Sequence, residues 1–101
     1  MLNSSIIQNF AQELQNARTT KVQLRQLSKS HPDATLASAY AIQKAWVKLE
    51  MERGHTAKGR KIGLTSKALQ QTFKANEPTH APLMDDMFFV DGAELPTNRF
   101  I

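Results

Sequence analysis

Lys61 is the residue whose surroundings most favour chemistry in this sequence. It lies in the segment Gly59-Arg60-Lys61-Ile62-Gly63-Leu64-Thr65-Ser66, where two glycines flank residues that favour a β-strand. A lysine ammonium that points into a partly dry pocket can bind a carboxylate or take part in proton transfer. The alternative is an ordinary surface lysine, and the residue types alone leave both open.

Thr65 and Ser66 offer two hydroxyl groups at the end of the same strand-like segment. They could contribute to a binding site there together with Lys61. Serine and threonine are also favoured helix N-caps, so the pair could instead begin a short helix at Lys67. Both interpretations stay open at this point.

Candidates for a metal site are few. The sequence has no cysteine, which excludes a disulfide, a thiolate metal site and a cysteine nucleophile. His31, His55 and His80 lie far apart and show no paired ligand spacing. Asp85 and Asp86 are adjacent, so on a strand they would point to opposite faces as solvated or turn-forming carboxylates. The residue types therefore favour solvated carboxylates over metal ligands here and leave the second interpretation open.

Charge is unevenly spread along the chain, which has 13 basic and 9 acidic residues and a net charge of +4. Six basic residues and no acid lie from Arg53 to Lys74, and five acids without Lys or Arg lie from Glu77 to Glu94. A basic stretch can attract a small anion or nucleic acid, or simply neutralise the acidic stretch that follows. Nucleic acid is disfavoured, because no aromatic residue that could stack on bases precedes Phe73 in this stretch.

The first helix is predicted from about residue 6 to 18, where apolar residues recur at steps of three and four. Ser5 and Gln8 have the spacing of a capping box at its start. The segment 29–33 is predicted to be a connection, because Pro32 disfavours helix at the residue before it.

A second helix is predicted from about residue 36 to 53 and has the clearest signals. Thr35 is a favourable N-cap, and Gly54 follows the helix where a left-handed residue is needed. Tyr40 and Trp46 lie on its apolar stripe, which indicates a buried packing face in preference to a ligand site.

Short elements separated by turn residues fill the second half. The sequence predicts, in order, a strand at about 59–64, a helix at 67–73 capped by Ser66, a loop at 75–82, a strand through 83–90, a turn at Asp91-Gly92, and an extended run through Leu95 and Phe100-Ile101. Helices followed by strands predict an α+β fold. We expect one unit, with a helical region at about 1–58 and the start of a β-rich part at about 59–101.

The length of 101 residues suffices for one small domain, and a hydrophobic fraction of 41% is ordinary for globular proteins. No apolar run approaches the ~20 residues that a membrane span needs. The first residues also lack the features of a signal peptide, so we expect a cytoplasmic protein without membrane contact. The chain stops on Phe100-Ile101 without a polar tail, which favours a piece cut from a larger protein.

Three segments together resemble the 2-keto-4-pentenoate hydratase family of the fumarylacetoacetate hydrolase superfamily. They are Ala39-Tyr40-Ala41-Ile42-Gln43, Gly59 to Ala68, and Asp85-Asp86-Met87-Phe88-Phe89 followed by Asp91-Gly92. The resemblance covers essentially the whole chain and corresponds to the N-terminal third of family members. It implies the N-terminal part of a larger β-rich fold, with a helical region in front.

The resemblance implies a hydratase of aromatic catabolism that adds water to a 2-hydroxy-2,4-dienoate, such as one of the 2-oxohept-4-ene-1,7-dioate type. A divalent metal, usually magnesium, chelates the 2-oxo acid head in this family and stabilises enolate-like charge. The family's metal ligands lie in a P-R-I-E-x-E block and beyond, which is expected to begin just after Ile101. The resemblance therefore implies a chain that is inactive alone and holds no metal, and a full-length parent that is a homo-oligomer.

The resemblance also assigns candidate site residues. Lys61 matches the family's active-site lysine, which lies near the substrate carboxylate and is a candidate proton donor or acceptor. Thr65 and Ser66 match family positions at the same strand end. After Glu77-Pro78 the sequence departs from the family, because Thr79-His80-Ala81 replaces the usual Asp, aromatic residue and Gly. This leaves no carboxylate at Thr79, and His80 is a candidate substitute in the substrate site.

Two other functions stay open. The chain could be a small basic helical module that binds an acidic partner or nucleic acid through the Arg53–Lys74 stretch, which would give salt-sensitive binding. It could also be an assembly element whose oligomer contacts come from the helix that carries Tyr40 and Trp46. Reduced oligomerisation of a Trp46→Ala variant would support that second function.

Overall fold

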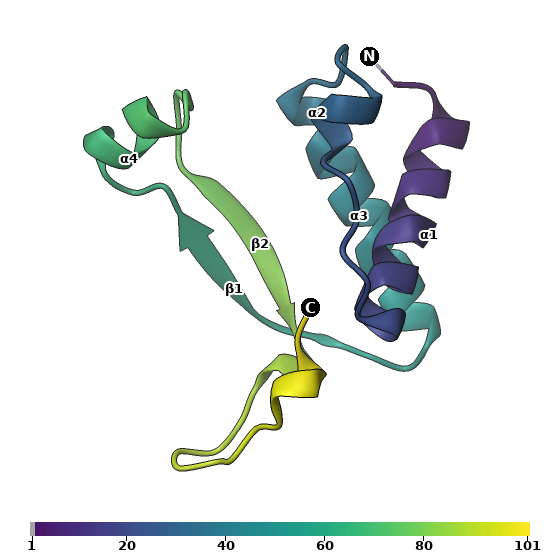
Figure 1. The fold of residues 1–101 in the computed structure, drawn as a ribbon, viewed down its shortest axis with the longest axis vertical. Coiled ribbons are helices and arrows are strands. Elements are labelled where there is room, and N and C mark those ends of the chain that lie inside the picture. Colours follow the sequence, from purple (N-terminus) through teal and green to yellow (C-terminus); the bar gives the residue numbers. More distant parts are fainter. Residues whose placement is uncertain (1) are drawn as a thin grey trace.

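Two long helices pack side by side in the computed structural model, which describes residues 2–101. They are α1 (Ser4–Thr20) and α3 (Leu36–Glu52), and the short helix α2 (Leu27–Ser30) lies on the connection between them (Figure 1). Apolar side chains at helical spacing meet between α1 and α3, because each helix buries one face against the other. The buried centre of this core consists of Leu2, Phe10, Ala11, Ile42 and Ala45.

The second predicted helix is confirmed at both ends. The Thr35 hydroxyl accepts a hydrogen bond from the Ser38 backbone N–H at 3.1 Å, as expected of an N-cap. Gly54 has a φ of +93°, the left-handed conformation that glycine adopts without steric cost.

The start of the first helix differs from the prediction. The Asn3 side chain caps α1, since its Oδ1 accepts from the Ile6 N–H at 2.9 Å. Ser5 therefore lies inside the helix, and the predicted capping box with Gln8 is wrong. Asparagine caps helices about as well as serine, and capping at Asn3 lets the helix begin two residues before the predicted start.

The second half forms an antiparallel hairpin of β1 (Ala57–Gly63) and β2 (Thr79–Met84). Helix α4 (Lys67–Thr72) lies in the connection and is capped by Ser66, as predicted. The predicted loop at 75–82 is wrong from residue 79 onward, because β2 begins there and includes Pro82. Each strand of a two-stranded sheet is an edge strand, where a proline is tolerated.

The chain after β2 forms no further strand among the described residues. Asp85–Met87 and Thr97–Arg99 are short 3-10 helices, and Gly92 has a φ of +80° in the predicted turn. We call residues 85–101 the arm. The predicted strand through 83–90 is right for Leu83 and Met84 and wrong beyond them, since the Asp85 side chain accepts a hydrogen bond from the Asp86 N–H where the 3-10 helix begins. The predicted extended run is interrupted by the 3-10 helix at 97–99, although Phe100 itself is extended.

The predicted α+β class is confirmed, with helices first and the hairpin after them. The hairpin and the α1–α3 pair diverge in a V shape, and they come together near the C-terminal ends of α1 and α3 (Figure 1). The molecule measures 40 × 35 × 23 Å along its principal axes. In the part of the chain that is described, no helix has both the length and the apolar character needed to cross a membrane.

Candidate functional site

Lys61 lies at a cleft between α3 and the hairpin, which we call the α3/β2 cleft. One part of it is a cavity of about 290 Å³. A second cavity of about 320 Å³ adjoins it, since Ala39, Gln43 and Ala81 line both. The first cavity is lined by Leu36, Ala39, Tyr40 and Gln43 from α3 and by Lys61, Gly63, Thr79, His80 and Ala81 from the hairpin. The structure thus places Lys61 and His80, two predicted site residues, at one cleft.

The strand register explains how the hairpin wall is built. Lys61 is the cross-strand partner of Ala81, and Gly63 is the partner of Thr79. Residues two apart on a strand share a face, so these four residues form one patch. A Cβ at Gly63 would lie 3.1 Å from the Thr79 hydroxyl, so glycine allows the two strands to pack closely there.

His80 is held directly by α3. Its imidazole stacks on the Tyr40 ring, with the ring centroids 4.5 Å apart and the planes 13° from parallel. Its backbone N–H donates to the Tyr40 hydroxyl at 3.3 Å, and its carbonyl accepts from Gln43 Nε2 at 3.2 Å. Tyr40 therefore does more than contribute to the packing stripe, because it joins α3 to β2.

Thr65 and Ser66 are not brought to the wall of this cleft. Leu64 has a φ of +53°, a left-handed conformation that is uncommon for a bulky residue and turns the chain away from the line of β1. Gln70 Nε2 donates to the Leu64 carbonyl at 2.9 Å and holds this turn. The Ser66 hydroxyl accepts from the Leu69 N–H at 3.1 Å, so it acts as a helix cap.

A network of charged residues lies where the helices meet the hairpin. Arg18 of α1 contacts Glu50 of α3 at 2.6 Å and both carboxylate oxygens of Asp86 at 2.5 Å. His55 Nδ1 lies 2.9 Å from Asp85 Oδ1. Glu50 is fully buried, and a buried carboxylate requires partners of this kind.

The ion pairs of Arg18, Glu50 and His55 were not predicted from the sequence. One signal was present, since Glu50 follows Trp46 by four residues and so lies on the apolar stripe of the helix. An acidic residue on such a stripe indicates a buried ion pair, but the stripe gives no information about the partner.

The sequence predicted that Asp85 and Asp86 point to opposite faces of a strand, and this prediction is wrong. Both lie in the 3-10 helix that begins the arm. The hydrogen bond from His55 lowers the pKa of the Asp85 carboxyl below its ordinary value, against a smaller opposing effect of burial. For Asp86, burial acts to raise the pKa, but the hydrogen bond and charge of Arg18 outweigh it and the net shift is downward.

His55, Asp85 and Asp86 bring one ligand atom each within 4.8 Å of one another, which is the separation that a metal site would need. The trio does not fit magnesium. Magnesium prefers an octahedron of oxygen ligands, whereas one ligand here is a histidine nitrogen and both Asp86 oxygens already bind the Arg18 guanidinium. The chemistry of this cluster is that of an ion-pair network.

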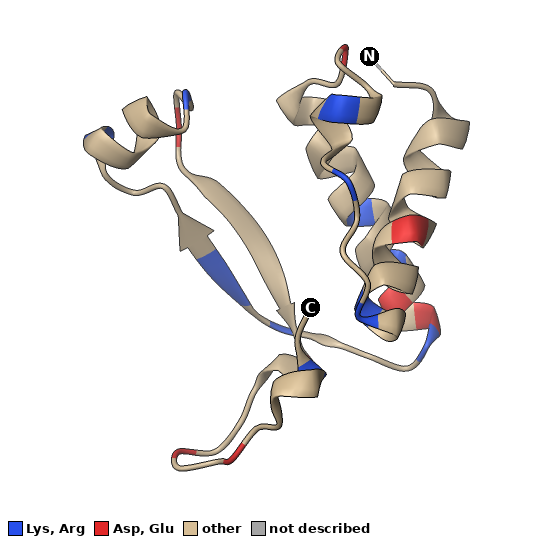
Figure 2. Cartoon of the chain, in the orientation of Figure 1, with Lys and Arg blue, Asp and Glu red and all other residues tan. Residues whose placement is uncertain are grey.

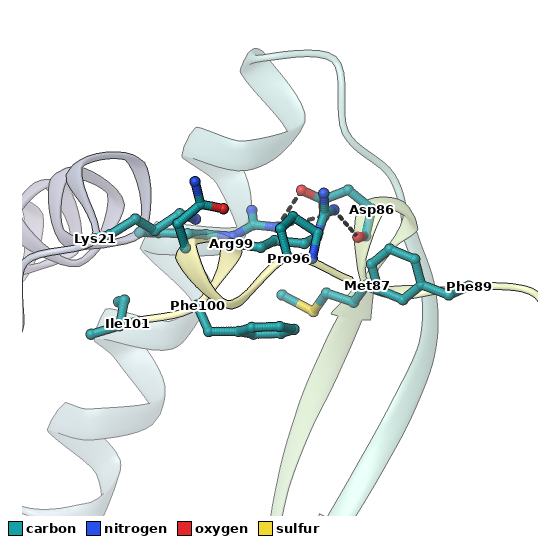
Figure 3. Close-up of a pocket in the computed structure, with 10 residues that line it drawn as sticks. Lys21, Asp86, Met87, Phe89, Pro96, Arg99, Phe100 and Ile101 are labelled. Carbon is teal, nitrogen blue, oxygen red and sulfur yellow. Dashed lines mark hydrogen bonds and ion pairs between the residues drawn. The ribbon is translucent and has the colours of Figure 1, made fainter. Parts of the chain in front are cut away.

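The arm and the end of α1 line a larger cavity of about 720 Å³. Figure 3 shows Lys21, Asp86 and Arg99 beside the rings of Phe89 and Phe100. Arg99 donates to the Asp86 carbonyl at 3.1 Å, and its guanidinium lies 4.8 Å from the centre of the Phe89 ring. None of the predicted site residues lines this cavity.

The predicted charge segregation is visible in the fold (Figure 2). The basic stretch runs through β1 and α4, and acidic residues lie at the tip of the arm. Lys61 thus belongs to a basic strand that faces the α3/β2 cleft.

Comparison with known proteins relates the chain to enzymes of one kind. It is 48% identical over 92 residues to 2-oxo-hept-4-ene-1,7-dioate hydratase of Escherichia coli, which covers 91% of this chain and 34% of that protein. It is 37% identical over 86 residues to 2-keto-4-pentenoate hydratase of Paraburkholderia xenovorans, covering 85% and 32%. The chain therefore spans about a third of the length of the curated relatives it matches. No protein-family model matches it.

Solved structures agree with these sequence relatives. The structure of 4-oxalocrotonate decarboxylase from Pseudomonas putida G7 complexed with calcium and acetate matches with a TM-score of 0.82 at 26% identity. The match covers 85% of this chain and 33% of that one. The same enzyme complexed with magnesium and adipate matches equally well. The fold of this chain is thus part of a larger fold in the matched enzyme.

Proposed function

Since the chain is homologous to part of the 2-keto-4-pentenoate hydratases, we propose that it forms part of an enzyme that adds water to a 2-hydroxy-2,4-dienoate. The substrate class that we propose is a dicarboxylate of the 2-oxohept-4-ene-1,7-dioate type, in the breakdown of aromatic compounds. The observation that carries this proposal is the 48% identity over 92 residues, in a chain whose Lys61 lines the α3/β2 cleft.

Lys61 is the residue that binds a substrate carboxylate in this proposal. Among residues 2–101 it is the one lysine that lines the cavities of this cleft, at an exposed position. An ammonium can form a charge-assisted hydrogen bond with a carboxylate and can also exchange a proton with a neighbouring carbon or oxygen acid. Thr79 offers a hydroxyl on the same patch, where it can donate to the same ligand but cannot act as a carboxylate base.

His80 supplies the titratable group that Thr79 lacks. It lines the same cavity as Lys61, but it pairs with Ile62, so its side chain leaves β2 on the face opposite to that of Lys61 and Thr79. In this proposal its imidazole, stacked on Tyr40, is the candidate titratable group of the site. Thr65 and Ser66 stay candidates for substrate contacts, although in this structure they lie beyond the turn at Leu64.

A divalent metal, magnesium in the first place, belongs to the proposed enzyme, as supported by the calcium and magnesium complexes of the matched decarboxylase. The cluster of His55, Asp85 and Asp86 does not fit it, so we propose that its ligands lie outside residues 1–101. Titration calorimetry tests this, and tight magnesium binding by the 101-residue chain would contradict it. We also propose a homo-oligomer, which sedimentation analysis tests.

The carboxylate site is tested by ligand titration of the chain. We propose that adipate, which the matched decarboxylase binds, perturbs the amide NMR signals around Lys61 and Thr79, and that Lys61→Met removes most of this response. Arg60→Met is the matched control, because it removes an equal charge from the adjacent residue on the other face of β1. Equal losses in both variants would show an unspecific charge effect and contradict the site.

Activity is tested in a protein that contains this chain together with the rest of a family member. Hydration breaks the conjugation of the dienoate, so it can be followed as a loss of ultraviolet absorbance in the presence of magnesium. We expect Lys61→Met to lower kcat/KM by about 10²- to 10⁴-fold, as for loss of a general acid or base. If kcat/KM of the Lys61→Met variant equals that of the wild type, Lys61 has no role in the reaction.

A further inference from the structure

Two side chains of α3 cover the outer edge of β2 at His80. An antiparallel strand turns the N–H and C=O of alternate residues away from its partner strand. At His80 these two groups meet the Tyr40 hydroxyl at 3.3 Å and the Gln43 amide at 3.2 Å. The contacts satisfy groups that water or another strand would otherwise bind, so they join the helix to the edge of the sheet.

The rings of the same pair strengthen this junction. The Tyr40 and His80 rings are nearly parallel at a centroid separation of 4.5 Å, within the range of favourable aromatic stacking. Two hydrogen bonds and one stack on a single residue define both its distance from α3 and its orientation.

We propose that Tyr40 and Gln43 are positioning residues that set the shape of the α3/β2 cleft. This inference rests on the proposed function, because it concerns the same carboxylate site. Neither residue has to touch the substrate, since both act through the backbone of His80. The neighbours of His80 in β2 are Thr79 and Ala81, which pair with Gly63 and Lys61. If β2 moved away from α3, the paired strand β1 with Lys61 would therefore move away from α3 as well.

Two single-group changes test the inference on the 101-residue chain. Tyr40→Phe removes the hydroxyl that accepts from His80 but keeps the ring on the imidazole, so the fold is expected to persist. Gln43→Met removes the amide donor at nearly constant volume. Gln8→Met is the matched control, because Gln8 is exposed on α1 and its side chain forms no hydrogen bond with any described residue.

Adipate and acetate are titrated into each protein, and binding is followed through the amide NMR signals of Lys61, Gly63 and Thr79. We expect Gln8→Met to bind adipate like the wild type, and each α3 variant to bind it roughly fivefold to tenfold more weakly, as for the loss of one hydrogen bond. The ratio of the adipate to the acetate dissociation constant should rise as well. In this proposal acetate needs only the Lys61 ammonium, whereas adipate extends along the cleft. A smaller fraction of folded protein would weaken the apparent binding of both acids equally and leave the ratio unchanged.

The outcomes separate the two proposals. The positioning role is wrong if both α3 variants bind adipate as tightly as the wild type. It is also wrong if the ratio of the adipate to the acetate dissociation constant is the same in the variants and the wild type. In both cases the carboxylate site stands. If the wild type shows no saturable response to either acid, the carboxylate site at Lys61 fails and the role given to Tyr40 and Gln43 fails with it, whereas the proposed hydratase function is decided separately by the activity of the protein that contains the rest of a family member. Circular dichroism of each variant verifies that the helices are retained.

Discussion

Arg18 joins two carboxylates that come from distant parts of the chain. Its guanidinium contacts Glu50 and Asp86, which follow it by 32 and 68 residues. Glu50 has no exposed surface, so its charge is stable in the fold only because Arg18 and the Gln15 amide surround it. The planar fork of the arginine side chain suits such double pairing, and a lysine there would offer only a point charge.

Removal of Arg18 should therefore be costly. We expect Arg18→Met to lower the free energy of unfolding by roughly 3 kcal/mol, because it leaves the buried Glu50 carboxylate without its charge partner. Urea denaturation followed by circular dichroism measures the loss. Arg25→Met, at an exposed position between the helices, is the control and should change stability little. In the double variant Arg18→Met/Glu50→Met the buried charge is gone, so a double variant less stable than Arg18→Met would contradict this account.

The two arm aspartates predict a pH dependence. The pKa of each carboxyl is lower in the fold than its ordinary value of about 4, mainly through His55 for Asp85 and, against burial, through Arg18 for Asp86. Their stabilising effect is therefore complete above about pH 4 to 5 and is lost as the pH falls toward their lowered pKa values. Unfolding free energies measured from pH 7 to pH 3 should decline below this point. The decline should be shallower in Asp86→Asn and unchanged in Asp91→Asn, a control at the tip of the arm.

At the scale of elements, the arm is attached to the hairpin through Phe88. A Cβ at Gly59 would lie 3.0 Å from the tip of the Phe88 ring, so the ring packs directly on the glycine backbone of β1. The Lys58 ammonium lies 5.3 Å from the centre of the same ring and adds a cation–π contact. The glycine is thus needed for close packing, because its backbone φ is not in the left-handed region.

Gly59→Ala should disturb this contact. We expect a loss of about 1–3 kcal/mol in the free energy of unfolding, because the added methyl group overpacks the contact with Phe88. Thermal or urea unfolding measures it. The double variant Gly59→Ala/Phe88→Leu, with a smaller side chain above the methyl group, should recover part of the loss. A Gly59→Ala protein as stable as the wild type would show that the ring moves aside freely.

At the scale of the whole molecule, the arm leaves large apolar side chains at the surface. Phe89 is 45% exposed, Phe100 55% and Val90 81%, and two of these line the cavity in Figure 3. Exposed apolar groups that lie together in this way are typical of surfaces that contact other parts of a protein or a partner.

This exposure predicts dye binding by the isolated chain. We expect an anionic hydrophobic dye such as ANS to fluoresce with the 101-residue chain, and the double variant Phe89→Ser/Phe100→Ser to lose more than about half of the signal. Phe73→Ser is the control, since Phe73 is 66% exposed and follows α4, at the far end of the hairpin from the arm (Figure 1). Equal signals from all three proteins would place the dye elsewhere on the molecule.

Most of the local structure could be predicted from the sequence. Thr35, Gly54 and Ser66 define helix ends through hydrogen bonds or backbone preferences that extend over a few residues, and these predictions are confirmed. The wrong predictions concern the start of α1 and the end of β2, where a neighbouring polar side chain forms a hydrogen bond that was not predicted. Asn3 capped α1 in place of Ser5, and the hydrogen bonds of Asp85 ended β2 where the apolar residues 87–90 had predicted that it continues.

The sequence by itself determined the α+β order of elements and the caps at Thr35, Gly54 and Ser66, and its resemblance to a known family made Lys61 a candidate. Only the tertiary structure decided that Lys61 shares a cleft with His80, that Tyr40 holds His80, and that Arg18 pairs with Glu50 and Asp86. These contacts join residues more than 15 positions apart, and the side-chain periodicity of a helix or strand encodes which face is buried, not which distant side chain it meets. The packing of α1 on α3 and of the hairpin against both determines which side chains meet, so these contacts exist only in the folded chain.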